Sequence, residues 1–225
     1  MSLKAQLDAC RCEYEANAAP HVVDAVRRSA QALAETGLVA KAVKAGETAP
    51  LFRRRCGRGG FIDLSDLLER GPVVISFFRG DWCPFCVLEL EALAAAHPEI
   101  ERLGATLIAV SPQPPAKSSS LDSDSQAPFS ILRDPDCEIV SRYRIAFTIP
   151  QQFRAAYRAL DYPNAAKTRS QSWVLPIPAT YVLDSTGLVV LSYLDADHTT
   201  RLEPAEIIVA LTSLGSANIP HGNNR

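Results

Sequence analysis

Two uninterrupted apolar runs dominate the hydropathy pattern of the chain. Residues 72–78 (PVVISFF) and 105–111 (ATLIAVS) are rich in β-branched residues, as is typical of strands buried on both faces. Residues 84–97, which lie between them, carry apolar residues at helical spacing. This order predicts a strand–helix–strand unit with two parallel strands and a right-handed crossover.

Shorter patterns predict the rest of the fold. We expect strands at residues 129–132, 179–184 and 188–194, helices at residues 136–143, 150–160 and 203–214, and a surface loop at residues 112–126. The turn sequence Asp184-Ser-Thr-Gly187 predicts that the last two strands form an antiparallel hairpin. Together these elements indicate an α/β fold with a mixed central sheet flanked by helices.

The N-terminal segment has a different pattern. Residues 3–36 favour helix and are divided at Pro20, which predicts two helices. We therefore expect a helical extension over residues 1–38, a main domain over 39–215 and a disordered tail over 216–225.

Composition and charge narrow the possible functions. The chain has 225 residues and a net charge of −2, which gives no positive field to attract nucleic acid. No run reaches the length of a membrane span, and the N-terminus has no apolar core of a secretory signal. We expect a cytoplasmic protein that binds neither nucleic acid nor membrane.

The clearest candidate site is the sequence Trp82-Cys83-Pro-Phe-Cys86, between a buried strand and a helix. A thiolate at a helix N-terminus is stabilised by the unpaired N–H groups and the helix dipole. A second thiol three residues further on can form a disulfide with it. The pattern therefore predicts a redox-active cysteine pair.

Two other interpretations of this pair remain open. A zinc site could add Cys10 and Cys12, but Cys-x-Cys is poor ligand spacing for a structural zinc. Alternatively, Cys83 and Cys86 are inert, partly buried thiols. We expect no metal and no other cofactor.

The segment FFRGDWCPFCVLELEAL, together with LPIPATYVLDSTG downstream, resembles the peroxiredoxins of the alkyl hydroperoxide reductase/thiol-specific antioxidant family. The resemblance extends from about Gly46 to Leu214 and implies a thioredoxin-like fold. The family signature, Pro-x-x-x-Thr-x-x-Cys followed by Glu, places the peroxide-attacking cysteine at Cys86 and the glutamate at Glu89. The chain departs from the signature at two positions.

Those two departures are Cys83, at the threonine position, and Arg79, at the proline position. Cys83 lacks the hydroxyl that would orient a peroxide but offers a resolving thiol. Arg79 offers a cation that lowers the pKa of a nearby thiol. Trp82 is expected to pack beside the disulfide. The family also has a separate active-site arginine, for which the sequence offers three candidates: Arg142, Arg144 and Arg201.

The same residues also resemble the active sites of thioredoxin and glutaredoxin. In that interpretation Cys83 attacks and Cys86 resolves. Pro178, which precedes a strand, would be the cis-proline that faces the disulfide in those proteins.

Three functions follow from these resemblances. The first is a thiol peroxidase, in which Cys86 attacks hydrogen peroxide or a small organic hydroperoxide, Cys83 forms the disulfide, and thioredoxin or a glutaredoxin with glutathione reduces it. The second is a protein thiol–disulfide oxidoreductase, and the third is a redox-sensing interaction module. We expect a homodimer that needs no metal, flavin or nucleotide.

The remaining candidate residues carry weaker signals. Cys10-Arg-Cys12 could be a second redox pair, but residues two apart on a helix do not face each other. Cys56 lies beside four arginines, and Cys137 is expected in the first turn of a helix. The cluster Asp195, Asp197 and His198 is interpreted as a solvated loop and helix cap.

Overall fold

A five-stranded mixed sheet forms the centre of the molecule. The computed structural model describes residues 1–56, 60–113, 127–160 and 173–217. The strand order is β5-β4-β3-β8-β9, with β3 (Val73–Phe77), β4 (Thr106–Ser111), β5 (Ser130–Arg133), β8 (Ala179–Leu183) and β9 (Val189–Leu194). β3, β4 and β5 run parallel, whereas β8 and β9 are antiparallel to their neighbours. Both the predicted parallel unit and the predicted hairpin are confirmed.

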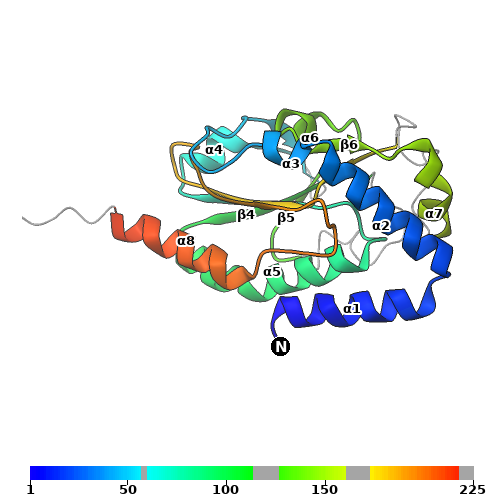
Figure 1. Cartoon of the computed structure of the whole chain (residues 1–225). Helices are drawn as coiled ribbons and strands as arrows, with labels where there is room; N and C mark the ends of the chain where they lie inside the picture. The colour runs from blue at the N-terminus through cyan, green and yellow to red at the C-terminus, as the bar shows by residue number, and fades with distance from the viewer. Residues whose placement is uncertain (57–59, 114–126, 161–172, 218–225) are drawn as a thin grey trace, which may run out of the picture.

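Helices cover both faces of this sheet. They are α1 (Leu3–Asn17), α2 (Pro20–Glu35), α3 (Leu38–Lys41), α4 (Leu64–Leu68), α5 (Pro84–Arg102), α6 (Glu138–Arg142), α7 (Arg154–Ala159) and α8 (Pro204–Ala217), with a 3₁₀ turn at Gln151–Phe153. Figure 1 shows α5 and α8 on one face and α4 and α6 on the other. Within the described ranges, no helix is long and apolar enough to span a bilayer.

The alternation of side chains along β3 builds a core on each face of the sheet. Val74 packs with α5 and α8 residues such as Leu93 and Ile207, whereas Ile75 and Phe77 pack on the opposite side. Because every residue of β3 is buried, the strand is apolar except at Ser76, whose hydroxyl donates a hydrogen bond to Glu89. This central, rigid strand carries the candidate site at its C-terminal end.

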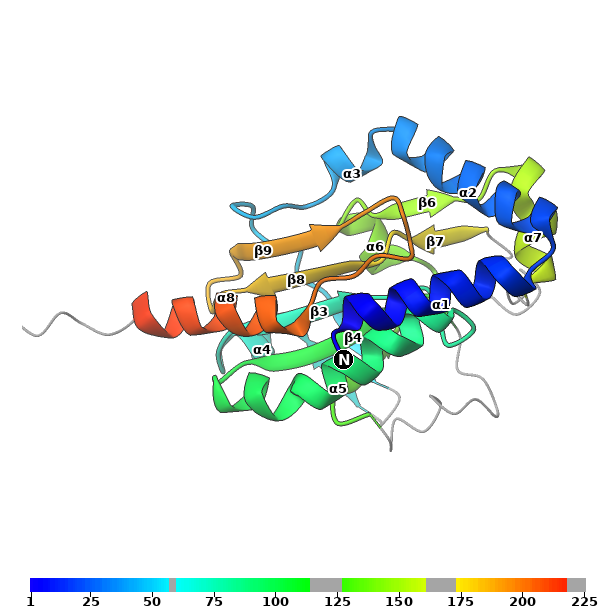
Figure 2. The ribbon, with the colours of Figure 1, turned by 60° about the horizontal axis from the view of Figure 1, so that its bottom comes forward.

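The two N-terminal helices are part of the packed structure. Leu3 and Leu7 of α1 belong to the same core cluster as α5, and Figure 2 shows the two helices side by side. Val22 and Val26 of α2 pack with residues of the segment that carries α7. α2 then crosses the molecule and ends near α3 (Figures 1 and 2).

The carboxylate of Glu203, directly before α8, caps the start of α1. It accepts hydrogen bonds from the backbone N–H of Leu3 (3.2 Å) and of Lys4 (2.7 Å). These N–H groups have no partner inside their own helix. The start of α1 is therefore linked to the residue that directly precedes α8.

The basic, glycine-rich turn within residues 51–64 predicts a hairpin of short strands, and the antiparallel pair of β1 (Arg53–Arg55) with β2 (Phe61–Asp63) confirms it. The sequence did not predict the antiparallel pair of β6 (Ala146–Thr148) with β7 (Val174–Pro176). α5 is longer than predicted, because it continues through Pro98 to Arg102. Most of the predicted loop, residues 114–126, lies outside the described residues. The predicted disordered tail, residues 216–225, is wrong at its first two positions, because α8 continues to Ala217, and the rest of it lies outside the described residues. The predicted boundary at residue 38 stays a prediction.

Candidate active site

The turn between β3 and α5 holds the cysteine motif. Cys83 is the N-cap residue of α5 and Pro84 is its first residue, a position that proline tolerates because no helical N–H is lost there. Gly80 has a φ of 151°, and a Cβ at this position would overlap the side chains of Trp82 and Gln113. Gln113 in turn accepts a hydrogen bond from the N–H of Asp81 (2.8 Å). The turn therefore requires glycine and fixes the entry into α5.

Both cysteines of the motif are buried, Cys83 with 2% and Cys86 with 0% of its surface exposed. A hydrogen bond from the Cys86 side chain lowers the pKa of the Cys83 thiol to about 6, assisted by the charges of Arg79 and Arg201. Burial and the neighbouring Cys83 sulfur raise the pKa of the Cys86 thiol. Near neutral pH the pair therefore holds one thiolate and one thiol, with Cys86 as the proton donor.

Arg201, from the segment before α8, reaches the same pair from across the fold. Its Nη2 donates to Cys86 Sγ at 3.1 Å and its Nε donates to Glu89 Oε2 at 2.5 Å. The carbonyls of His198 and Thr200 hold Nη1, each at 2.6 Å. The guanidinium of Arg201 is thus held by hydrogen bonds from all three of its nitrogens, and Nη2 contacts the Cys86 sulfur.

Glu89 completes this arrangement one helical turn after Cys86. Its second oxygen accepts hydrogen bonds from the hydroxyls of Ser76 and Thr180, each at 3.3 Å. Burial raises the pKa of Glu89 to about 7, partly offset by Arg201. Burial alone would lower the pKa of Arg201, but Glu89 and the two cysteines outweigh it and raise that pKa. Arg201 therefore stays charged beside the thiols.

Arg79 provides a second buried guanidinium at the site. It is 3% exposed and lies over the ring of Trp82 at 4.8 Å and that of Tyr157 at 5.4 Å. Among the described residues, its Nε has no hydrogen-bond partner. The structure thus brings Arg79 and Trp82, both singled out in the sequence, to the cysteine pair.

One sequence-based expectation at this site is wrong. The peptide bond before Pro178 is trans, as are all the described peptide bonds. The cis expectation rested on likeness to thioredoxin alone, and X-Pro bonds are predominantly trans in folded proteins. Pro178 nevertheless is buried and lines a small cavity with Arg79 and His198.

Two of the three arginine candidates lie elsewhere. Arg142 pairs with Glu138 and donates to the carbonyl of Leu51. Arg144 pairs with Glu47. Arg201 alone of the three contacts a cysteine, which sequence spacing could not reveal.

The other cysteines are separate from the pair. Cys10 is half-buried and Cys12 exposed, whereas Cys56 and Cys137 are buried. Cys137 caps α6 in a left-handed conformation with a φ of 55°, and burial raises the pKa of its thiol to about 12. Across the described ranges, no three His, Cys, Asp or Glu side chains form a metal-binding group.

His198, which the sequence analysis interpreted as part of a solvated loop and helix cap, instead lies against the site. Its carbonyl binds Arg201, and its ring meets Phe85 edge-to-face with 5.8 Å between ring centroids. Burial, with Arg79 and Arg201 nearby, lowers the pKa of the imidazole well below its ordinary value. The ring is therefore neutral at physiological pH.

A mixed sheet with a cysteine pair at the start of the following helix defines a thiol-based redox protein of the thioredoxin-like fold. Residues 45–192 match the model of the AhpC/TSA family. The chain belongs to this family, as its sequence resemblance predicted.

Individual proteins agree with this assignment. The chain is 30% identical over 102 residues to a "Putative peroxiredoxin bcp" of Helicobacter pylori, covering 45% of this chain and 66% of that one. It is 26% identical over 160 residues to "Peroxiredoxin Q, chloroplastic" of Triticum aestivum, covering 71% and 63%. These alignments span just under two thirds of the relatives' own length.

Solved structures show the same fold. The peroxiredoxin 6 of Arenicola marina matches with a TM-score of 0.60 at 19% identity, covering 78% of this chain and 76% of that one. The peroxidoxin BcpB of Mycobacterium tuberculosis matches with a TM-score of 0.56 at 18% identity, covering 77% and 97%.

Proposed function

We propose that the protein is a thiol-dependent peroxidase that reduces hydrogen peroxide or small organic hydroperoxides through a Cys83–Cys86 dithiol/disulfide cycle. The observation that carries this proposal is the hydrogen bond from Arg201 to Cys86 Sγ at 3.1 Å. A fixed cation stabilises the thiolate that attacks. The same guanidinium has one N–H left, on Nη2, with which it can stabilise the charge that develops on the peroxide oxygens.

The cycle begins from the Cys83 thiolate and the Cys86 thiol. The Cys86 proton moves to Cys83, and the Cys86 thiolate attacks the terminal peroxide oxygen. The O–O bond breaks, Cys86 becomes a sulfenic acid, and the departing alkoxide or hydroxide takes the proton from Cys83. The Cys83 thiolate then attacks the Cys86 sulfur and displaces hydroxide, which a solvent proton converts to water.

The oxidised protein needs an external reductant. We propose thioredoxin, or a glutaredoxin with glutathione, whose two thiol electrons open the disulfide by exchange. Such reductants fit the expected cytoplasmic location.

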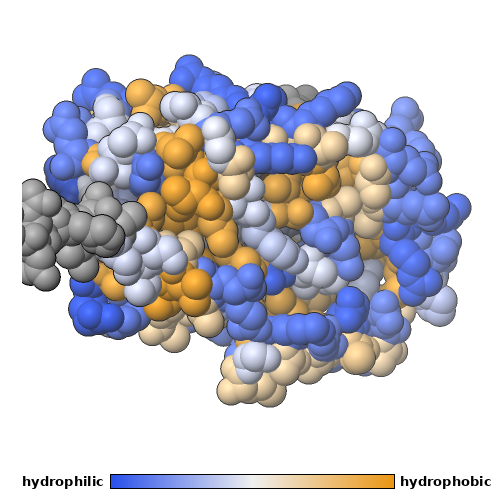
Figure 3. Space-filling view, turned by 60° about the vertical axis from the view of Figure 1, so that its left-hand side comes forward, coloured by the Kyte–Doolittle hydropathy of each residue, from blue (hydrophilic) through white to orange (hydrophobic). Residues whose placement is uncertain are grey.

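We also propose a homodimer. Apolar side chains reach the surface in patches (Figure 3), and Val209 of α8 is 66% exposed.

Trapping the sulfenic acid with a dimedone probe tests which cysteine attacks. After hydrogen peroxide treatment, Cys83→Ser should accumulate labelled Cys86, because the resolving thiol is gone. Cys86→Ser should give no label in the motif, as identified by peptide mass spectrometry. Label on Cys83 in the Cys86→Ser variant, and none in Cys83→Ser, would contradict the proposal.

One observation favours a second candidate function. Cys83 has the lowered pKa and the helix N-cap position of an attacking thiol in a protein thiol–disulfide oxidoreductase. That function requires Cys83 to form mixed disulfides with protein substrates. A Cys86→Ser variant that captures such partners, without sulfenate formation on Cys86 in the Cys83→Ser variant, would support it instead of the peroxidase.

A further inference from the structure

Arg79 is a buried cation that no carboxylate neutralises. The residue is 3% exposed, and its guanidinium lies over the rings of Trp82 and Tyr157. Arg201 pairs with Glu89, whereas no described carboxylate forms an ion pair with Arg79, and among the described residues its Nε has no hydrogen-bond partner. Because a buried charge without a counter-charge is costly, another anion has to balance Arg79.

In the reduced protein, the Cys83 thiolate is that anion. The charge of Arg79 helps to lower the pKa of Cys83. Above the pKa of Glu89, about 7, the buried charges then cancel, with Arg79 and Arg201 opposite the carboxylate and the thiolate. Formation of the disulfide with Cys86 removes the thiolate. The oxidised site is therefore left with one positive charge in excess.

A small inner cavity beside Arg79 has the chemistry of an anion site. Its volume is about 10 Å³, which is room for about one water-sized group. The polar side chains that line it are those of Arg79, Ser29, Tyr157 and His198, and none of its described lining residues is an aspartate or a glutamate. A ligand there meets N–H and O–H groups but no negative charge.

The neighbours of Arg79 can donate to such a ligand together with its Nε. The hydroxyls of Ser29 and Tyr157 lie 3.4 Å apart, so Ser29 can donate to a ligand while it accepts from Tyr157. The neutral ring of His198 still carries one N–H. The volume excludes phosphate, sulfate and carboxylates, which leaves a monatomic halide.

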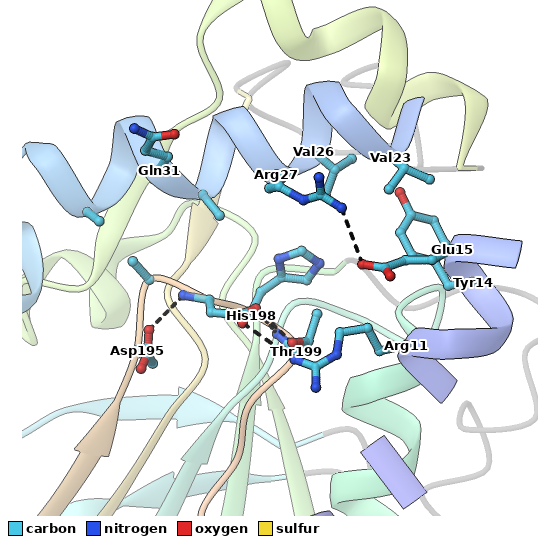
Figure 4. Close-up of a pocket in the computed structure, with 14 residues that line it drawn as sticks. Arg11, Tyr14, Glu15, Val23, Val26, Arg27, Gln31, Asp195, His198 and Thr199 are labelled. Atoms are coloured by element: carbon cyan, nitrogen blue, oxygen red, sulfur yellow. Dashed lines mark hydrogen bonds and ion pairs between the residues drawn. The ribbon is translucent and has the colours of Figure 1, made fainter. Parts of the chain in front are cut away.

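A surface cavity of about 550 Å³, lined by α1, α2 and the loop between β9 and α8, adjoins the inner one. Ala30 and His198 line both cavities. Figure 4 shows the imidazole of His198 pointing from this loop toward α2. The route from solvent to the inner cavity therefore passes the His198 ring.

We propose that the inner cavity is a halide site, which binds chloride when Cys83 and Cys86 form a disulfide and releases it when the Cys83 thiolate returns. The inference rests on the disulfide of the proposed function and adds a ligand to it. On reduction, an external dithiol becomes a disulfide and gives up two electrons and two protons. One proton stays on Cys86, the other enters solvent, and chloride leaves with it, so that charge is conserved.

The redox equilibrium of the protein tests this exchange. The chain is equilibrated with reduced and oxidised dithiothreitol while chloride replaces gluconate at constant ionic strength. Gluconate is too large for the inner cavity and controls for salt screening. Because chloride stabilises only the oxidised form, a tenfold rise in chloride should lower the equilibrium constant for reduction by up to about tenfold, or about 30 mV.

Variants assign the effect to Arg79. Arg79→Met removes the charge and should abolish the chloride dependence. Arg154→Met is the matched control, because Arg154 also lies over an indole ring, that of Trp173 at 5.2 Å, but does not line the inner cavity. It should keep the full dependence. Equal dependence in Arg79→Met, or none in the original chain, would overturn the proposal.

Ser29→Ala is a milder change that tests the site even if Arg79→Met fails to fold. Alanine retains the helical propensity of α2 but removes one donor. The chloride concentration at half effect should rise about fivefold. An unchanged value would contradict the proposed ligation.

Long-wavelength diffraction locates the ion independently of the disulfide. The Cys83→Ser/Cys86→Ser double variant cannot form a thiolate, so Arg79 lacks its counter-charge whether or not the original chain cycles. An anomalous chloride peak should lie beside Arg79 in this variant and in the oxidised protein, but not in the reduced protein. A water there without anomalous signal, or peaks on the surface alone, would refute the site. A disulfide that never forms would count against the proposed function, and the double variant would still decide the site.

Discussion

The chemistry of the Cys83–Cys86 pair depends on one shared proton. Cys83 sits at the helix N-cap and accepts a hydrogen bond from the Cys86 side chain. Arg201 donates to Cys86 from the opposite side. Each sulfur thus has its own means of carrying negative charge, and moving the proton selects which one attacks.

The lowered pKa of Cys83 predicts a pH titration. Thiolate absorbance at 240 nm should rise through a midpoint of about 6, since the thiolate forms above its pKa and is lost on acidification. Cys86→Ala removes the hydrogen-bond donor, so the midpoint should move upward toward the ordinary 9.0. Cys83→Ala serves as the control and should eliminate the low step. A low step that persists in Cys83→Ala would place the thiolate on Cys86.

At the scale of residues, the sequence identifies local chemistry but not distant partners. The spacing of the two cysteines and of Glu89 three residues later lies within one helix start, so a pattern reveals it. Arg201 is 115 positions from Cys86, and the chain offers three equivalent arginine candidates. His198 was assigned to a solvated loop for the same reason, because its position depends on where that loop lies against α5.

At the scale of elements, the β3–α5 turn controls the geometry of the pair. The turn holds Trp82 beneath Arg79 and closes through the contact of Asp81 with Gln113. Gly80 has no side chain, which lets the indole and the Gln113 amide approach its backbone. The position of Cys83 therefore depends on a residue that takes no part in the chemistry.

Gly80→Ala should lower the free energy of unfolding by roughly 1–3 kcal/mol and change the tryptophan emission, because the new methyl group displaces Trp82. Urea unfolding followed by fluorescence measures both effects. Gly104→Ala is a matched control, since Gly104 also has a positive φ but open space around its Cβ position. It should show the backbone strain without the emission change. Identical behaviour of the two variants would argue against steric control by Gly80.

Elements with a strong pattern were predictable, whereas elements that depend on partners were not. β3 and β4 are long apolar runs and were located to within a residue or so. β6 and β7 contain three residues each, too few for a hydropathy period. They form because Ala146–Thr148 lies opposite Val174–Pro176 in the fold, a long-range pairing that local propensity does not encode.

At the scale of the whole molecule, the N-terminal helices complete the core. Val22 and Val26 pack with Ile149 and Trp173, and Leu7 packs in the cluster that contains Cys83 and Cys86. The sequence predicted these helices but not where they pack, because the apolar face of a helix does not determine which other element it contacts. α1 and α2 also contribute residues, with His198, to the lining of a surface cavity of about 550 Å³.

Removing residues 1–37 should therefore destabilise the protein. Each fully buried valine or leucine that is lost contributes about 1.5–3 kcal/mol. We expect a lower urea midpoint and increased binding of the dye ANS, because the surface around Trp173 becomes exposed. An unchanged midpoint would mean that residues 1–38 are an independent extension, as the sequence pattern alone suggested.

The cap that Glu203 places on α1 has a consequence for the order of synthesis. α1 is synthesised before α8, yet the carboxylate that accepts hydrogen bonds from its first N–H groups lies 200 residues later. Its packing partner α5 also has to be made first. The start of α1 therefore lacks this cap until residue 203 has been synthesised. The docking of α1 on the rest of the fold is therefore completed only after Glu203 has been made.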